Sequence, residues 1–432
     1  MVNQILMEDY FNPGFKSGPL VHIGSQTHVM WTGIEQEQAM EGFHLSAVQN
    51  HNVGVVRNFD PLYINYWKSL NETAKVINLL NVDTKKYLSE VLLENPLILN
   101  TVKEKMHPNS RLMTFFITEL EEKLAQTLGI PLHGSMNVSK RYGTKSGIRL
   151  LADKASIAMA SGSICGTLED IYRAIEILRN NFESVVIKHD LSASGYWSKK
   201  IDLINFENAK GQIKEFVENI SKQLKQESNI FVVEGWLKSK ASLCAHIEII
   251  KGKEPIICAA WEQIIDSDGI SYVGAGPLQL STIAFESFRT EVQKLATVLT
   301  KEGVEGSFGP DFLITSEEET NFGPDKAILI ELNARAPVTA FPLELIKHVK
   351  GKIGSGFLSS HIKLKKPAKF IDIKEILEDK NLLILKKDDK NTGVIPFNIG
   401  MLPWKTFDVV VMADSWEETK HIMLKVKSIF EE

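Results

Sequence analysis

The stretch AILIELNARAPVT, residues 327–339, decides the fold, because a short apolar run leads directly into an acid, an amide and a base. Glu331, Asn333 and Arg335 stand at alternate positions there, and alternate residues of a β-strand point to the same side. An ionised side chain without a partner is costly in an apolar setting. The stretch therefore predicts a core strand that ends in polar side chains, for which packing alone gives no reason.

A second acid precedes this strand, in the segment SFGPDFLI at residues 307–314. If the two segments pair, Asp311 lies beside Glu331, and Asn333 adds an amide oxygen to the two carboxylates. Such oxygen donors suit Mg²⁺, which takes one or two carboxylates and leaves other positions to water and nucleotide phosphates. A salt bridge between Glu331 and Arg335 explains the same residues without a metal, and these residues alone leave both interpretations open.

Two further strand ends carry polar residues. Lys188 ends the apolar segment SVVIK, and the small-residue loop SASG follows at residues 192–195, where backbone N–H groups can approach a phosphate closely. The segment VVEGWL releases Glu234, a carboxylate able to bond an adenine edge while Trp236 and Leu237 pack around the base. An ordinary surface turn and an ordinary strand exit explain these two segments equally well.

Composition restricts the class of protein. The chain has 432 residues, of which 44% are hydrophobic and 24% charged, as expected for a soluble globular protein of one large or two to three ordinary domains. The formal net charge of -5 gives no general attraction for nucleic acid or for an anionic membrane. We therefore expect neither nucleic acid nor a membrane as a partner.

Cysteine usage and the chain start point to the cytoplasm. Cys165, Cys244 and Cys258 are too few and too scattered for a disulfide framework or a CxxC metal site, which favours reduced intracellular thiols. The first residues lack the pattern of a signal peptide, and no apolar run reaches the roughly 20 residues of a membrane span. We expect a cytoplasmic protein.

Hydrophobic periodicity outlines the elements. Before residue 135, short strand-like runs alternate with helical patterns at 87–102 and 119–129. From Lys140 onward, helices and strands alternate, and residues 241–266 resemble an antiparallel hairpin. Residues 347–369 are basic and contain glycine and serine, which suggests a solvated connector. Strands are then expected at 381–385 and 408–413, before a helix that starts with a capping box from Ser415 to Glu418.

The order of these pieces resembles the ATP-grasp superfamily, whose members clamp ATP between two α+β subdomains. The resemblance covers roughly residues 135–345, and its most specific part is the acid–x–Asn element of Glu331 and Asn333 with an Asp-bearing strand before it. It implies that Lys145 and Lys188 contact phosphates and that Arg335 stabilises charge at the transferring phosphoryl group. Lys188 and Arg335 are thus the expected catalytic residues. The remaining roles it implies are a phosphate loop of Ser192, Ala193, Ser194 and Gly195, an adenine hinge of Glu234, Gly235, Trp236 and Leu237, and magnesium ligands Asp311, Glu331 and Asn333.

The flanking segments resemble one branch of the superfamily more closely. YWKSL (66–70), residues 119–134 and residues 392–419 look like the pre-ATP-grasp and C-terminal units of pheganomycin-type peptide ligases, with butirosin-type acyl-carrier-protein ligases as near relatives. The fold class implied is a mixture of α+β and α/β. Its domains are an N-terminal pre-ATP-grasp α/β domain at 1–135, an ATP-grasp domain at 136–346, and a linker with a small C-terminal α+β unit at 347–432.

Two positions depart from the superfamily pattern. Many members have an acidic ribose-binding residue shortly after the hinge, but Lys238 and Lys240 stand there, so either ribose recognition differs or Glu248 or another later acid supplies it. Many amide ligases have an arginine two residues before the metal-binding aspartate, and Gly309 stands there, which gives more importance to Arg335.

The resemblance implies an ATP-dependent carboxylate–amine ligase, with ATP and Mg²⁺ as cofactors and an acyl-phosphate intermediate. The chemistry consists mainly of positioning and electrostatic stabilisation, in agreement with the absence of any nucleophile motif. A carboxylase or a thiol or acyl-carrier ligase with the same ATP site, and a non-catalytic nucleotide-binding protein, are the alternatives. Expected partners are a small-molecule carboxylate and an amine, such as an amino acid or peptide, and superfamily analogy suggests a homodimer.

Overall fold

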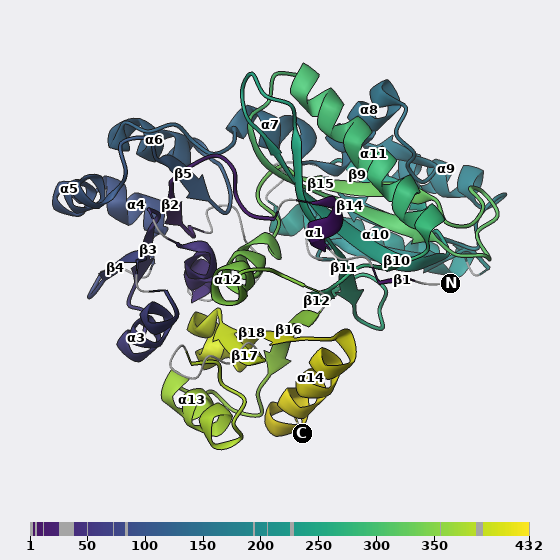
Figure 1. Cartoon of the computed structure of the whole chain (residues 1–432). Helices are drawn as coiled ribbons and strands as arrows, with labels where there is room; N and C mark the ends of the chain where they lie inside the picture. The colour runs from purple at the N-terminus through teal and green to yellow at the C-terminus, as the bar shows by residue number, and fades with distance from the viewer. Residues whose placement is uncertain are drawn as a thin grey trace.

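Three larger β-sheets with their covering helices make up the computed structural model of the chain (Figure 1). The structure describes residues 3–4, 7–11, 13–25, 39–49, 51–71, 73–82, 85–192, 195–204, 206–224, 229–354, 356–385 and 392–431. None of the helices within these ranges is long and apolar enough to cross a membrane.

The N-terminal sheet is parallel, with strand order β4-β3-β2-β5. Its strands are β2 (Leu20–Ile23), β3 (Val53–Arg57), β4 (Lys75–Leu79) and β5 (Arg111–Thr114). The helical elements around it are η1 (Met40–Ala47), α3 (Pro61–Leu70), α4 (Leu88–Leu93), α5 (Pro96–Lys105) and α6 (Glu119–Leu128). The expected helix over residues 87–102 is in fact two helices, because Pro96 lacks an N–H and starts a new helix.

A second sheet, of four antiparallel strands, has the order β6-β9-β7-β8. Its strands are β6 (Gly162–Cys165), β7 (Ser184–His189), β8 (Ser198–Asp202) and β9 (Phe231–Gly235). Apolar side chains of α9 (Leu168–Leu178) and α10 (Phe206–Gln223) share one core with this sheet. The Thr167 side chain accepts a hydrogen bond from the Asp170 N–H and so caps the start of α9.

The third sheet has eight strands in the order β15-β14-β10-β11-β12-β16-β18-β17, all antiparallel. Its strands are β10 (Ser239–Ile249), β11 (Ile256–Ile265), β12 (Tyr272–Gly276), β14 (Gly306–Thr315), β15 (Ala327–Asn333), β16 (Gly356–Lys363), β17 (Gly393–Phe397) and β18 (Thr406–Ala413). The expected hairpin of residues 241–266 is confirmed as β10 and β11. The expected pairing of the two polar strands is also confirmed, because Asp311 lies directly opposite Glu331.

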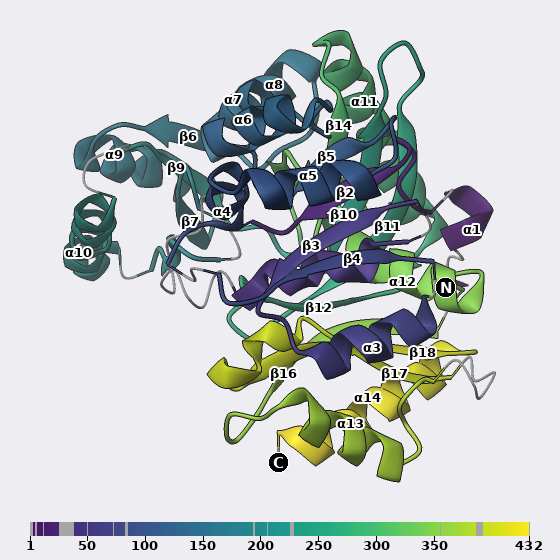
Figure 2. The same ribbon diagram turned by 90° about the vertical axis from the view of Figure 1, so that its left-hand side faces the viewer.

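Helices cover both faces of the eight-stranded sheet. One face packs against α11 (Thr282–Lys301), where the Phe288 and Phe312 rings meet edge to face, and against α14 (Trp416–Phe430). The other elements are β1 (Asn3–Gln4), α1 (Met7–Tyr10), α7 (Met136–Tyr142), α8 (Lys145–Ala155), β13 (Gln279–Leu280), α12 (Ala340–Lys350), α13 (Phe370–Asp379) and η3 (Ile399–Trp404). Figure 2 shows the N-terminal strands in front of β10 and β11, with the C-terminal elements below them.

Two expectations for the C-terminal part were wrong. Residues 347–369, expected as a solvated connector, contain the end of α12 and the largely buried strand β16, which joins β12 to β18 in the large sheet. Residues 381–385 form only a single bridge, between Leu383 and Val394. The part of the chain after residue 346 therefore extends the central sheet, and the domain boundaries stay predictions.

Buried histidines lie where the N-terminal sheet meets the eight-stranded sheet. His22 of β2, His44 of η1 and His246 of β10 are each at most 2% exposed, and Phe341 of α12 packs against the first two. Burial lowers the pKa of His22 to about 3 and of His246 to about 4, and it holds the pKa of His44 well below its usual value. These histidines are neutral in the folded chain at neutral pH.

We expect the free energy of unfolding to fall as the pH drops below about 6.5. In the unfolded chain these histidines become protonated near that pH, whereas in the folded chain His246 becomes protonated only near pH 4 and His22 only near pH 3. The loss is about 1.4 kcal/mol per pH unit for each histidine. Urea midpoints at pH 7.5, 6.5 and 5.5 measure it. His246→Gln should make the pH dependence shallower, whereas His51→Gln, at an exposed position, should leave it unchanged. A wild-type midpoint independent of pH over this range would contradict the expectation.

Candidate active site

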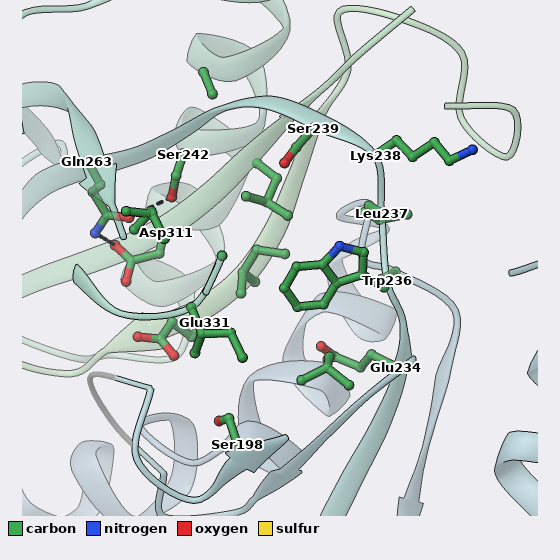
Figure 3. A pocket seen from close by; sticks show the side chains of 18 of the residues that line it. Ser198, Glu234, Trp236, Leu237, Lys238, Ser239, Ser242, Gln263, Asp311 and Glu331 are labelled. Atoms are coloured by element: carbon green, nitrogen blue, oxygen red, sulfur yellow. Dashed lines mark hydrogen bonds between the residues drawn. The ribbon is translucent and has the colours of Figure 1, made fainter. Parts of the chain in front are cut away.

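A pocket of about 850 Å³ lies between the four-stranded and the eight-stranded sheets. Strands β7 and β9 line it from one side, and β10, β11, β14 and β15 line it from the other (Figure 3). Most of the residues singled out from the sequence line this pocket, namely Lys145, Lys188, Ser192, Gly195, Glu234, Gly235, Trp236, Leu237, Asp311 and Glu331. Asn333 and Arg335 do not line it and lie next to the two acids instead.

The two acids form the polar end of the pocket. Asn333 donates from Nδ2 to Asp311 Oδ2 at 3.1 Å and to Glu331 Oε1 at 3.5 Å, and Gln263 Nε2 donates to Asp311 Oδ1 at 3.1 Å. Burial and the neighbouring Glu331 raise the pKa of Asp311 well above its usual value. Burial also acts to raise the pKa of Glu331, but the charge of Lys145 outweighs it and lowers this pKa to about 2. The pair therefore lacks enough positive charge to ionise fully.

Lys145 is the first residue of α8, a helix that begins there because the Thr144 side chain accepts a hydrogen bond from the Gly147 N–H. Its Nζ lies 2.6 Å from Glu331 Oε2 and donates to the Ser192 carbonyl oxygen at 2.7 Å. Lys145 thus joins the start of the phosphate-loop segment to the acid pair. With 8% of its side chain exposed, Lys145 has these two oxygens in place of the water that burial removes.

Glu234 holds a second group of charges. Its Oε2 lies 2.6 Å from Lys188 Nζ, and its Oε1 lies 2.6 Å from Arg149 Nη2. Burial raises the pKa of Glu234, but Lys188 and Arg149 together lower it below its usual value. Both oxygens of Glu234 are thus paired with cations, and its expected role at an adenine edge stays a prediction.

The hinge after β9 offers backbone groups instead. The N–H groups of Gly235 and Trp236 donate to Ser161 and Ser184 carbonyl oxygens, and that of Lys238 donates to Glu319. Among the described residues, the Leu237 N–H has no such acceptor. The Trp236 ring projects toward the pocket, with Lys200 Nζ 4.4 Å from its centroid (Figure 3). A flat ring and a free N–H thus lie side by side at the apolar end of the pocket.

The expected phosphate loop is only partly described. Ala193 and Ser194 lie outside the described residues. The Ser192 hydroxyl is buried in the pocket wall and has no hydrogen-bond partner among the described residues, which makes it available to a ligand. Gly195 has a φ of +82°, and a Cβ there would come within 2.8 Å of Ile270. The β11–β12 hairpin therefore touches the loop and borders the pocket.

Arg335 lies beyond the end of β15, on the side of the N-terminal domain. It donates to Asn333 Oδ1 at 3.2 Å, and its guanidinium lies 4.3 Å from the Phe115 ring centroid and 5.4 Å from that of Phe116. The alternative of a Glu331–Arg335 salt bridge is not what the structure contains, because Lys145 is the cation paired with Glu331. Arg335 thus reaches the acid pair only through Asn333.

Sequence reasoning missed two polar residues of the site and misjudged a third. Arg149 follows Lys145 by one helical turn, so helical spacing places both on one face of α8, and this signal was available. Gln263 carried no signal, because its contact with Asp311 depends on how β11 joins the sheet. Glu248, considered for the ribose, is fully buried and accepts bonds from Ser307 and from the Lys16 N–H.

Gly309 has a steric explanation. A Cβ at this position would come within 2.7 Å of Pro337, so the arginine found there in many amide ligases has no room. The Gly309 carbonyl oxygen instead accepts a hydrogen bond from Asn333 Nδ2 at 3.1 Å.

The acid pair can hold a divalent cation. Asp311 and Glu331 are adjacent hard oxygen donors, and burial together with the neighbouring Glu331 raises the pKa of Asp311, an effect that a bound cation would oppose. Asn333 offers its NH₂ to them here, so it would supply an oxygen only after its amide turns over. Neither here nor elsewhere within the described ranges is there a group of three or more His, Cys, Asp or Glu that could hold a metal ion, so the acid pair offers two carboxylates only.

The sequence matches no protein-family model and no curated protein. Solved structures give clear similarities over almost the whole chain. Biotin carboxylase from Campylobacter jejuni aligns with a TM-score of 0.60 at 11% identity, covering 95% of this chain and 90% of that one.

Two other enzymes align almost as well. N5-carboxyaminoimidazole synthetase from Staphylococcus aureus, solved with ADP, has a TM-score of 0.54 at 14% identity, covering 96% and 98% of the two chains. Phosphoribosylamine–glycine ligase from Thermotoga maritima has a TM-score of 0.56 at 13% identity, covering 95% and 96%. The expected fold class is confirmed, and the chain has the ATP-grasp fold with an N-terminal parallel α/β domain.

Proposed function

We propose that the protein is an ATP-dependent ligase that joins a carboxylate to an amine through an acyl phosphate, releasing ADP and phosphate. The observation that carries this proposal is the charge arrangement of the pocket. Two buried lysines, from helix α8 and strand β7, and two adjacent carboxylates of the eight-stranded sheet line one cavity of about 850 Å³, beside an apolar end with a flat aromatic ring. This arrangement suits a triphosphate at one end and a base at the other.

The proposed residue roles follow from the contacts. Trp236 and the Leu237 N–H would hold adenine, and the Ser192 hydroxyl with Lys145 and Lys188 would hold the phosphates. Asp311, Glu331 and, after rotation of its amide, Asn333 would hold Mg²⁺, which neutralises developing charge on the phosphates when bound. Glu317 and Glu318 also line the pocket and are the acids available to a ribose in place of Glu248.

The transfer itself would rest on position and charge. Arg335 is held flat by Phe115 and fixed by Asn333, so its guanidinium is preorganised for the negative charge of a transferring phosphoryl group. Gly195 and the tip of the β11–β12 hairpin close one side of the pocket, which would keep water from the acyl phosphate. Neither step needs a covalent nucleophile.

A carboxylase is the second candidate, because biotin carboxylase and N5-carboxyaminoimidazole synthetase are among the similar structures. Phosphoribosylamine–glycine ligase supports the amide-forming reaction in the same way. The closer resemblance to pheganomycin-type peptide ligases adds a preference for amino acids or peptides as substrates. ADP release measured with amino acid and dipeptide pairs, and separately with bicarbonate, distinguishes these reactions. Dependence on bicarbonate with no response to any pair would favour the carboxylase.

We expect Lys188→Ala and Glu331→Gln each to lower ADP formation by about 100-fold or more, because each removes charge at the transferred phosphate. Lys188→Ala leaves Arg149 paired with Glu234, so the fold should persist, as circular dichroism can check. Lys294→Ala and Glu286→Gln on α11 are matched controls on the opposite face of the sheet. Near-normal ADP formation by Lys188→Ala or by Glu331→Gln would contradict the proposed ligase function.

Replacing Trp236 should weaken nucleotide binding. Stacking of a base on an aromatic ring contributes about 1–3 kcal/mol, so Trp236→Leu should raise the Kd for ATP about 10-fold or more. Isothermal calorimetry measures the Kd, with Trp404→Leu, a half-exposed tryptophan of η3, as the control. An unchanged Kd in Trp236→Leu would place adenine elsewhere.

A further inference from the structure

A second polar group on the eight-stranded sheet has no part in the proposed ATP site. His361 of β16 bonds through Nδ1 to Asp408 Oδ1 on β18, and Asn398 Nδ2 donates to Asp408 Oδ2 at 2.8 Å. Asp408 and Asn398 are 3% and 7% exposed, so two polar side chains are buried to fix one histidine. Asn398 adopts a left-handed backbone conformation with φ +51°.

The histidine itself is accessible. The His361 side chain is 41% exposed, and among the described residues its Nε2 has no hydrogen-bond partner, because Asp408 takes only Nδ1. A purely structural pair would gain little from an exposed ring. A buried acid that orients a histidine whose second nitrogen is free is the arrangement of a general base.

Sheet register places this histidine on the same face as the acid pair. Residues directly opposite each other in antiparallel strands point to the same side of the sheet. Gln263 of β11 lies opposite both Ser242 of β10 and Ala275 of β12. Ala275 in turn lies opposite Ser359 of β16. His361 follows Ser359 by two residues and therefore shares its face. Asp311 shares that face as well, because Gln263 bonds to it.

Tyr272 lies between the pocket and this histidine. Its ring lines the pocket and meets the His361 ring edge to face at 5.8 Å between centroids. Its hydroxyl bonds to the Thr339 hydroxyl at 3.0 Å. Burial raises the pKa of Tyr272, and both Asp408 and Asp311 add to this effect, so the phenol lies within electrostatic range of both acids.

We propose that His361, oriented by Asp408 and Asn398, forms the acceptor-amine subsite and takes the proton that the amine loses before it attacks. This inference rests on the proposed ligase function, which supplies the acyl phosphate. The entering ammonium gives one proton to neutral Nε2, and the nitrogen lone pair then forms the C–N bond. The C–O bond to phosphate breaks with its electrons going to phosphate, which takes the second N–H proton.

The surroundings of His361 favour this role. Asp408 raises the pKa of His361 above its usual value, burial and Lys363 oppose the shift, and Tyr272 is the remaining titratable group against the ring. A stronger base is better matched to an α-amine, whose pKa is about 8. The exposed edge of the ring can pass the proton to water after each turnover.

The proposal is tested by comparing two nucleophiles, hydroxylamine and glycinamide. Each is added with MgATP and with one of the common amino acids as the carboxylate substrate. Hydroxylamine is unprotonated at neutral pH and needs no base, whereas glycinamide is largely protonated and does. We expect His361→Gln to lower the ratio of amide to hydroxamate by about 100-fold. His421→Gln, at an exposed position of α14, should leave the ratio unchanged.

The pH profile gives a second measurement. In Asp408→Asn the acid no longer raises the His361 pKa, so the rising limb of glycinamide transfer should move to lower pH. An unchanged amide-to-hydroxamate ratio in His361→Gln, including equal loss of both products, would overturn the subsite. If the wild type formed no hydroxamate with any acid, the proposed ligase function would fail first and this inference with it.

Discussion

The site depends on two carboxylates that the sheet places directly opposite each other. Like charges at such positions destabilise a β-ladder, and Asp311 and Glu331 are both largely buried. Lys145 compensates one of them, from the start of a helix that also contacts the four-stranded sheet through the Arg149–Glu234 pair. The ion pairs that make the carboxylates tolerable therefore also fix the two sheets relative to each other around the pocket.

In these ion pairs, a nucleotide could replace the carboxylate partner of each lysine. Burying Lys145 or Lys188 without a counter-charge would cost free energy, and Glu331 and Glu234 supply those counter-charges. A triphosphate that took over Lys145 would leave Glu331 free for a cation, so that nucleotide and cation binding would favour each other. Glu234 differs, because Arg149 remains as its partner when Lys188 turns to a phosphate.

The sequence predicted what local pattern and strand spacing control. Alternation placed Glu331 and Asn333 on one face, and the pairing considered for the segment at residues 307–314 brings Asp311 alongside. The four-residue spacing from Lys145 to Arg149 also predicts that both side chains lie on one face of a helix, and this signal was not used. Contacts that depend on distant strand neighbours could not be predicted, and His361 and Asp408, 47 residues apart, are the clearest example. The basic composition of residues 347–369 concealed β16, because its lysines cluster outside or at the end of a largely buried strand.

The position of β16 makes the C-terminal part a continuation of the sheet that lines the pocket. Without β16, β12 would pair only with β11 and would become the edge strand of the sheet. The apolar side chains that pack against α14 would also lose part of their cover. Removing β16 would also take away His361 while leaving every residue of the nucleotide pocket in place. A chain ending near residue 346 would therefore retain the groups for activating a carboxylate and lose the one proposed to receive the amine. The acid pair on β14 and β15 and the proposed amine subsite on β16 thus belong to one continuous sheet, in which β10, β11 and β12 lie between them.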